Sequence, residues 1–198
     1  MTGPPEIAEL DIIITGRGGQ GTKLAAQLLA SAAAVDGYFP LHYSVYGALI
    51  RGGDIASTIV IGSAPPRCAL RDSFAIMVAA HNNWFVRYYE FIRPGGILVY
   101  DPDSVPERLL TRSDLRHWPI GTGALAAEAG DHRAGNMVVA GACARIAGVP
   151  SLEGLDDAMA SVVPAHRQDR IRRNLAAVRS GWNWGEKVTS ELGETGRS

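Results

Sequence analysis

The sequence predicts an α/β fold with a doubly wound, mostly parallel sheet, helices on both faces and a helical C-terminal part. The first observation is a buried-strand pattern over residues 9–15, which includes three consecutive isoleucines. The second is an alanine-rich helical periodicity that begins near Thr22, directly after a glycine-rich turn. The third is the alternation of later apolar runs with helical stretches, which is typical of parallel sheets.

Short apolar runs bounded by glycine, proline or polar residues indicate the other strands. We expect these strands over residues 38–43, 55–61, 74–79 and 97–100. A turn at Pro94-Gly95-Gly96 precedes the last of them, and Asp101-Pro102 closes it.

Apolar residues at helical spacing indicate the helices. We expect helices over residues 22–35, 82–92 and 134–146, another that Pro150-Ser151 opens, and a last one over 166–179. Arginines cover much of the last helix, which is typical of a solvated face, although such a face can also contact a partner subunit.

Length and composition fit one domain over residues 1–185. The chain has 198 residues and 46% hydrophobic content, which is enough to bury a core. We expect a sheet core over about 9–120 and a helical part over about 121–182. Residues 186–198 bury little, so we expect them to form a disordered tail.

The charge balance and the apolar stretches exclude several classes of protein. Lysine and arginine total 19 against 20 acidic residues, so there is no overall basic field to attract nucleic acid. The longest apolar-looking stretch, residues 24–35, is shorter than the ~20 residues of a membrane span. The N-terminus lacks the features of a signal peptide. We therefore expect a cytoplasmic protein that binds neither nucleic acid nor a membrane.

Neither the cysteines nor the histidines form a recognisable metal or nucleophile motif. Cys68 and Cys143 are the only cysteines, whereas an iron–sulfur cluster normally takes four ligands. The histidines lack metal-ligand spacing, and no Gly-x-Ser-x-Gly motif is present. His81 follows a strand, but a lone histidine there is more often a hydrogen-bonded loop residue. We expect no metal site and no catalytic residue on this chain.

The glycine-rich turn predicts a place to hold phosphate. It reads Gly16-Arg17-Gly18-Gly19-Gln20-Gly21 and lies between the first strand and the first helix. Glycines let the backbone approach a ligand, and the free N–H groups of a first helical turn point at an anion. The Gln20 amide offers both a donor and an acceptor.

A nicotinamide or flavin site normally adds an acid about 20 residues further on, at the end of the second strand. Asp36 has this spacing but precedes the second strand, whose own end at residues 42–44 has no acid. An ordinary dinucleotide site is therefore disfavoured, although a stand-alone NAD- or FAD-binding reductase stays an alternative.

Two further patterns follow the second strand. Arg51-Gly52-Gly53 offers a bidentate anion donor on a flexible backbone, or is simply a surface turn. Gly53-Asp54 with the distant Asn82-Asn83 partly matches a thiamine diphosphate motif. Ile55 stands where that motif needs a glycine, which disfavours a thiamine site on this chain.

Together these motifs resemble the gamma subunit of the 2-oxoacid:ferredoxin oxidoreductases, which include the pyruvate, ketoisovalerate, 2-oxoglutarate, indolepyruvate and phenylglyoxylate enzymes. The resemblance covers roughly residues 9 to 182. The matching segments are residues 16–21, Tyr46-Gly47, Arg51-Gly52-Gly53, Arg93-Pro94-Gly95-Gly96, Gly135-Asn136-Met137 and residues 174–181. Residues 48–50 are apolar where the family often has an acid or a proline, so the oxoacid stays open.

The resemblance implies a non-catalytic subunit of an enzyme that oxidatively decarboxylates a 2-oxoacid and transfers the acyl group to coenzyme A. It implies alpha, beta and delta partner subunits, which carry thiamine diphosphate, Mg and 4Fe-4S clusters, with ferredoxin or NAD as acceptor. This chain would help to bind coenzyme A and cover the active site. The candidate coenzyme-binding residues are Gly16, Gly18, Gly19, Gln20, Gly21, Arg51, Gly52, Gly53 and Asn136. The alternative within the same complex is a purely structural scaffold.

Overall fold

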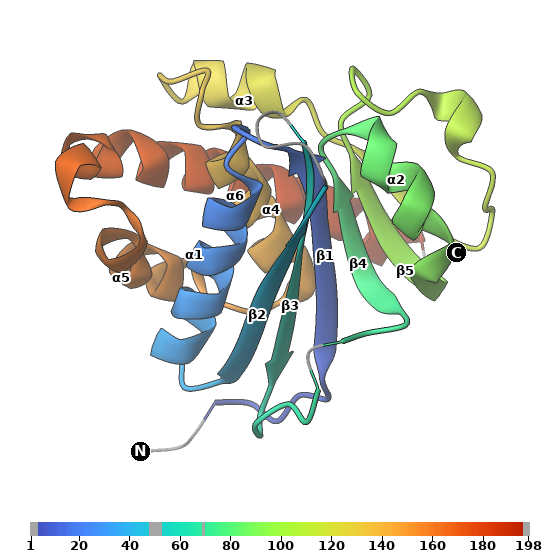
Figure 1. The fold of residues 1–198 in the computed structure, drawn as a ribbon, viewed down its shortest axis with the longest axis horizontal. Coiled ribbons are helices and arrows are strands. Elements are labelled where there is room, and N and C mark those ends of the chain that lie inside the picture. The colour runs from blue at the N-terminus through green and yellow to red at the C-terminus, as the bar shows by residue number, and fades with distance from the viewer. Residues whose placement is uncertain (1–3, 48–52, 69, 196–198) are drawn as a thin grey trace.

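The computed structural model describes residues 4–47, 53–68 and 70–195 (Figure 1). A six-stranded sheet lies at its centre, in the order β2-β3-β1-β4-β5-β6. The strands are β1 Leu10–Arg17, β2 Phe39–Tyr46, β3 Asp54–Gly62, β4 Phe74–Ala79, β5 Ile92–Tyr100 and β6 Arg116–Pro119.

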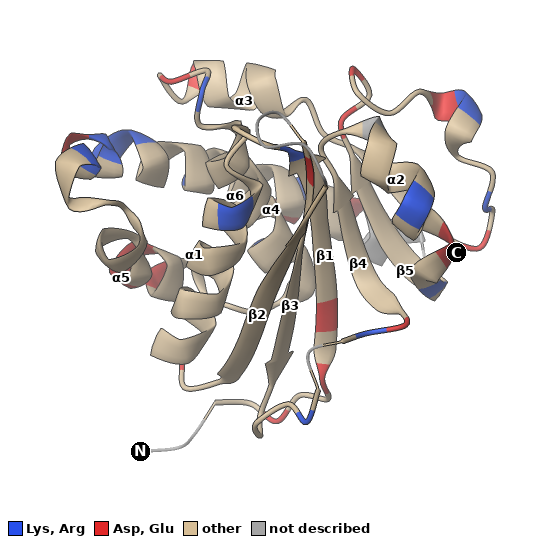
Figure 2. Ribbon diagram, in the orientation of Figure 1, with Lys and Arg blue, Asp and Glu red and all other residues tan. Residues whose placement is uncertain are grey.

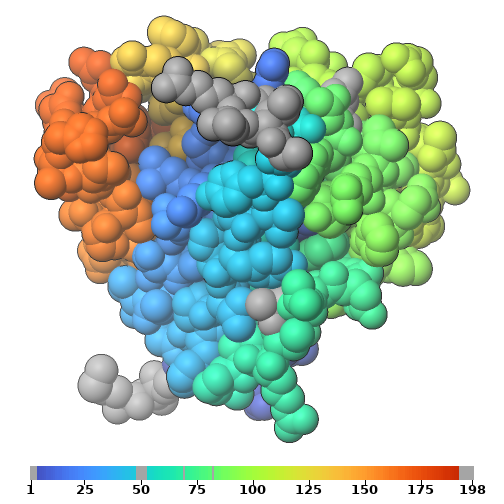
Figure 3. Space-filling view, viewed as in Figure 1, coloured from blue at the N-terminus to red at the C-terminus, as the bar shows by residue number. Residues whose placement is uncertain are grey.

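Most of the sheet is parallel, as the sequence predicts. Strands β1, β4, β5 and β6 pair in parallel, whereas β3 is antiparallel to both of its neighbours, β1 and β2. Only residues 47–53 join β2 to β3, which is too short for a crossover helix, so these two strands pair antiparallel. Strand β2 lies at the edge of the sheet, and Figure 3 shows it on the surface between α1 and α2.

Helices cover both faces of the sheet, as predicted (Figure 1). Helices α1, α4, α5 and α6 cover one face, while α2 and the short 3-10 turn η1 cover the other. The helices are α1 Thr22–Val35, α2 Asn82–Tyr88, α3 Thr122–Glu128, α4 Gly135–Ala147, α5 Leu152–Val162 and α6 Ile171–Thr195. The 3-10 turns are η1 Tyr89–Phe91, η2 Glu107–Leu109 and η3 Ala165–Arg170.

The central strand β1 contributes side chains to both hydrophobic cores. Ile12 and Ile14 pack in the larger core under α1 and α4, and Ile13 packs in the smaller core under α2. Successive side chains of a strand point to opposite faces, so a strand that is covered on both sides reads as a continuous apolar run. The three isoleucines thus place β1 in the middle of the sheet.

Helices α4 and α6 cross with their backbones in contact. A Cβ atom on Gly141 would collide with the Val178 carbonyl, and one on Gly181 would collide with the Val138 carbonyl. This crossing brings the beginning of α6 to the same end of the molecule as the N-terminal ends of α1 and α4. Among the helices of the described residues, none is long and apolar enough to cross a bilayer.

The structure corrects three sequence expectations. The expected turn at residues 94–96 lies within β5, where the pairing with β4 shifts register. Strand β6 was not anticipated, whereas helix α3 lies in the helical part expected from about residue 121. The tail expected to be disordered from residue 186 is helical to Thr195, because a helix that is already anchored extends at one hydrogen bond per added residue.

Candidate ligand site at the carboxyl edge of the sheet

A cavity of about 310 Å³ lies at the carboxyl ends of the parallel strands. Ala80 follows β4, Asp101 follows β5 and Thr122 lies just beyond β6, and all three line this first cavity. Open α/β sheets bind ligands in the crevice outside this edge, where connections leave to opposite faces. The glycine-rich turn that follows β1 forms another part of the wall.

Hydrogen bonds fold the glycine-rich turn back on itself. The Gly18 N–H donates to the Gly53 carbonyl at 2.7 Å, and the Gln20 N–H donates to the Arg17 carbonyl at 3.0 Å. The Gln20 Oε1 atom accepts from the Arg17 N–H at 2.6 Å. The acceptor half of the Gln20 amide therefore holds the turn together, and its nitrogen is the half that can face a ligand.

The N-terminal end of α1 is open toward the cavity. Its cap residue, Gly21, has a left-handed φ of 79°, provides no side-chain cap, and is followed by no acid in the first turn. The first amides of a helix have no intrahelical acceptor, so they carry a partial positive charge. Gly19 has a φ of 97°, and a Cβ there would meet nothing within 4 Å, so the backbone is bare on this side.

Asn136 joins the glycine-rich turn from the first turn of α4. Its Nδ2 atom donates to the Gly21 carbonyl at 3.3 Å, and a Cβ on Gly21 would lie 2.5 Å from that nitrogen. A Cβ on Gly16 would collide with the Thr22 hydroxyl, so this position also requires a bare backbone. The structure thus places Asn136 beside Gly21 and packs Gly16 against Thr22, whereas the role of these residues in binding coenzyme A stays a prediction.

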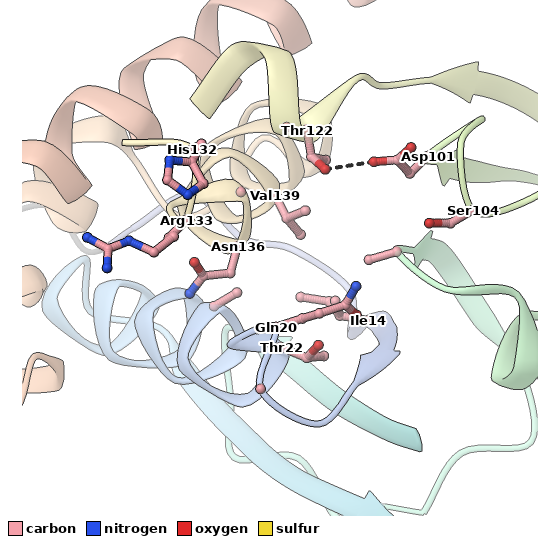
Figure 4. A pocket seen from close by; sticks show the side chains of 15 residues that line it. Ile14, Gln20, Thr22, Asp101, Ser104, Thr122, His132, Arg133, Asn136 and Val139 are labelled. Atoms are coloured by element: carbon pink, nitrogen blue, oxygen red, sulfur yellow. Dashed lines mark hydrogen bonds between the residues drawn. The ribbon is translucent and has the colours of Figure 1, made fainter. Parts of the chain in front are cut away.

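The second motif reaches the turn through Gly53, whose carbonyl accepts from Gly18. Arg51 and Gly52 lie outside the described residues, so their contribution stays a prediction. The sequence analysis treated Asp101 only as the end of a strand. Among the described residues, it is the one carboxylate that lines the first cavity. It accepts from the Thr122 hydroxyl at 2.7 Å and from the Asp103 N–H at 3.0 Å (Figure 4).

A second cavity, of about 320 Å³, lies on the other side of the turn. It shares four lining residues with the first, namely Gly19, Gln20, Arg133 and Asn136. Arg167 and Arg170, at the beginning of the last helical segment, also line it. Sequence reasoning left these arginines on a solvated face or a partner contact, and no local pattern indicates that they line a cavity together with the glycine-rich turn.

Two side chains of the partial thiamine motif, Asp54 and Asn83, bind each other in the structure. The Asn83 side-chain amide donates to both carboxylate oxygens of Asp54, at 3.3 and 3.4 Å, so these oxygens are already engaged. His81 Nδ1 accepts from the Asn83 N–H at 3.5 Å, as expected for a hydrogen-bonded loop residue. Across residues 4–47, 53–68 and 70–195, no group of three or more histidine, cysteine or acidic side chains could hold a metal.

Asp36 has a structural role at the opposite end of α1. Its carboxylate accepts from the Ser151 N–H at 2.5 Å and from the Ser151 hydroxyl at 2.9 Å, which ties α1 to the beginning of α5. In a dinucleotide fold the second strand lies beside the first, and its end supplies the ribose-binding acid. Here β3 separates β1 from β2, so neither the acid nor the strand is in place.

The family model of pyruvate ferredoxin/flavodoxin oxidoreductase matches residues 11–184. The 2-oxoglutarate synthase subunit KorC of Methanothermobacter thermautotrophicus is 29% identical over 181 residues, covering 86% of this chain and 92% of that protein. The ketoisovalerate oxidoreductase subunit VorA of the same organism is 26% identical over 193 residues, which are 95% of this chain but 39% of the relative.

Two solved structures share the fold. The keto/oxoacid ferredoxin oxidoreductase gamma subunit of Geobacter sulfurreducens is 26% identical with a TM-score of 0.78, covering 91% of this chain and 98% of that one. The 2-oxoglutarate:ferredoxin oxidoreductase of Magnetococcus marinus, solved with 2-oxoglutarate, coenzyme A and succinyl-CoA, is 23% identical with a TM-score of 0.80, covering 92% and 32%. The predicted resemblance is confirmed: because the family model spans most of its length, this chain belongs to the pyruvate ferredoxin/flavodoxin oxidoreductase family.

Proposed function

We propose that this chain is the gamma subunit of a multi-subunit 2-oxoacid:acceptor oxidoreductase, in which it helps to bind coenzyme A and cover the active site. Its KorC relative is a subunit of nearly the same extent, since the alignment covers 92% of it. In VorA the matching part is 39% of a longer chain, so a domain of this kind also occurs within a larger subunit.

The uncapped N-terminal end of α1, set between two cavities, is the observation that carries the proposal. A diphosphate needs several donors at close range, and the first amides of α1 supply them without a competing acid. Gly19 leaves room for the phosphate oxygens because no heavy atom lies within 4 Å of the place where a Cβ would stand. The two cavities provide space for the groups on either side of the diphosphate.

The remaining cofactors of such an enzyme would have to be held by partner subunits. Burial raises the pKa of the Cys143 thiol to about 12, so this thiol stays protonated and is a poor cluster ligand. Asp54 and Asn83 are engaged with each other rather than with a cation. We therefore assign thiamine diphosphate, Mg and the 4Fe-4S clusters to alpha, beta and delta subunits. For the complex as a whole we propose ferredoxin or NAD as the electron acceptor and the cytoplasm as the location.

The decisive experiment places a side chain in the bare region of the turn. In Gly19→Leu the added side chain enters the space between the cavities, and we expect coenzyme A affinity of the assembled complex to fall on the order of tenfold or more, about 1.4 kcal/mol. Isothermal titration calorimetry of the complex gives the affinity. The Michaelis constant for the 2-oxoacid should stay unchanged.

Gly95→Leu is a matched control at the opposite end of the sheet. Gly95 also has a positive φ, of 75°, and a Cβ there likewise meets nothing within 4 Å. Both variants thus carry similar backbone strain. If both variants assemble and Gly19→Leu leaves the coenzyme A affinity at the wild-type value, the scaffold alternative is correct and the binding role is lost.

A further inference from the structure

The second cavity gathers three arginine side chains from two segments of the chain. Arg133 comes from the loop before α4, Arg167 from η3, and Arg170 from the end of η3 where α6 begins. In Figure 2, blue segments mark basic residues on the ribbon between α5 and α6. The opposite wall of the cavity is the glycine-rich turn itself, through Gly19 and Gly21.

Among the described residues, two of the three guanidinium groups have no carboxylate partner. Arg133 pairs with Asp131 at 3.2 Å, and hydrogen bonds from Arg133, first from its backbone N–H, lower the pKa of that carboxyl. No carboxylate within the described ranges lies within 4.0 Å of Arg167 or Arg170. Other arginines of the chain do have such partners, namely Arg71, Arg93, Arg112, Arg145 and Arg179.

Local contacts hold the segment that carries Arg167 and Arg170 against the end of α5. The Gln168 side chain donates to the Val163 carbonyl at 2.8 Å, and the Arg167 N–H donates to the Pro164 carbonyl at 2.8 Å. Arg167 itself lies at a kink inside η3, with a non-helical φ of −129°. Arg167 and Arg170 both line the second cavity.

The net charge of the lining suits a phosphate monoester. Three arginines and the ionised Asp131 leave about two positive charges around the cavity. A phosphate monoester carries about −1.5 to −2 charges at pH 7 and presents three acceptor oxygens, which guanidinium groups bind in pairs. Two unpaired cations held in one cavity repel each other, and such an anion removes the repulsion.

We propose that this second cavity binds the 3′-phosphate of coenzyme A, with Arg167 and Arg170 as its anion ligands, while the diphosphate lies at the N-terminal end of α1. The inference rests on the proposed function, which supplies the ligand. It extends that function by dividing the two phosphate groups between two neighbouring sites, one of backbone amides and one of guanidinium groups.

The experiment compares coenzyme A with 3′-dephospho-coenzyme A by calorimetry on the assembled complex. For Arg167→Gln/Arg170→Gln we expect affinity for coenzyme A to fall on the order of 10- to 100-fold, as charged hydrogen bonds are lost. Affinity for the dephospho form should change less than about twofold. Arg172→Gln/Arg173→Gln is the control, because it removes the same charge from exposed positions at the beginning of the adjoining helix α6, and these positions do not line the cavity.

The outcomes separate this inference from the proposed function. Equal weakening of both ligands would overturn the assignment to the 3′-phosphate. If the wild-type complex binds coenzyme A and the cavity variant binds it equally well, the inference is wrong while the proposed function stands. If the wild-type complex binds neither ligand, the proposed function itself fails. Melting temperature and gel filtration verify that each variant folds and assembles.

Discussion

Arginines gather at both ends of the sheet, but their partners differ. At the amino end, Arg71 and Arg93 enclose Asp11, whose side chain is 1% exposed. The Arg71 Nε atom lies 2.7 Å from Asp11 Oδ1, and Arg93 donates to Asp11 Oδ2. At the carboxyl end, Arg167 and Arg170 line the second cavity, and no carboxylate of the described residues lies within 4.0 Å of either guanidinium group.

The arginines at the amino end compensate a buried carboxylate of the fold, whereas those at the carboxyl end are available to bind an anion. A buried carboxylate must be compensated by the chain itself, so its cations cannot be removed without cost. Cations that face a cavity and water need no internal partner, and they set the sign of the potential for an incoming anion. The two ends should therefore respond in opposite ways to the loss of an arginine.

The largest effect is expected at the amino end. Arg71→Met keeps the aliphatic stem but leaves Asp11 with only the half-exposed Arg93 as counter-charge. Breaking a buried pair costs about 3 kcal/mol of the unfolding free energy. Urea unfolding at pH 7 measures this cost, and a loss below about 1 kcal/mol would mean that Asp11 is compensated by water instead.

Another carboxylate that serves the fold is Asp36, which links α1 to the beginning of α5. Asp36→Ala removes the acceptor for the Ser151 N–H and hydroxyl, so we expect a loss of about 2 kcal/mol in unfolding free energy. Affinity for coenzyme A should be unchanged, since this contact lies at the far end of the helix. A selective loss of nucleotide affinity in a stably folded Asp36→Ala variant would restore the dinucleotide interpretation.

The cost of Arg71→Met should depend on pH. Burial raises the pKa of Asp11 above its ordinary 3.8, and Arg93 and Arg71 hold it down, so removing Arg71 raises it further. A raised folded-state pKa stabilises the fold below 3.8, and this contribution is lost as pH rises through the folded-state pKa. The deficit relative to wild type should therefore shrink on acidification from pH 7, by about 1.4 kcal/mol per pKa unit gained.

Unfolding curves of both proteins across the acidic range measure this change. Asp11→Asn in the Arg71→Met background removes the titrating group and should abolish the pH-dependent part of the deficit. A deficit that keeps the same size as pH falls would show that Asp11 is not the group that Arg71 compensates.

Local sequence patterns predicted much of the fold. The helix at residues 22–35 and the strand at 74–79 have the predicted bounds because apolar periodicity and flanking glycine or polar residues agree there. Strand β6 was missed because its four residues, Arg116–Pro119, include an arginine and a histidine and lie at the edge of the sheet. Strand β3 is antiparallel because only residues 47–53 connect it to β2. The prediction from alternating strands and helices did not take the shortness of this connection into account.

The sequence predicted the candidate site only where residues that are adjacent in the sequence, or that belong to a family motif, form it. The glycine-rich turn is contiguous, and the family motif added Asn136, which the structure brings to Gly21. The arginine-lined cavity could not be found in this way, because Arg133 and Arg170 lie far along the chain from the turn with which they line it. Helices α4 and α6, which begin close to these two arginines in the sequence, cross with their backbones in contact. That crossing depends on Gly141 and Gly181, whose bare backbones let the helices touch, and no local pattern reports such a contact.

The smallest effect on stability should occur at the carboxyl end. Arg167 is exposed and Arg170 half-buried, and neither has a carboxylate partner in the described part of the chain. Arg167→Gln/Arg170→Gln should therefore leave the unfolding free energy within about 0.5 kcal/mol of wild type, because it breaks no ion pair. Any change should be a gain at low ionic strength that disappears as salt screens the repulsion between the two cations. Urea unfolding in low and high salt measures both. A loss comparable to that of Arg71→Met would mean that these arginines hold the fold together, and the contrast between the two ends of the sheet would not stand.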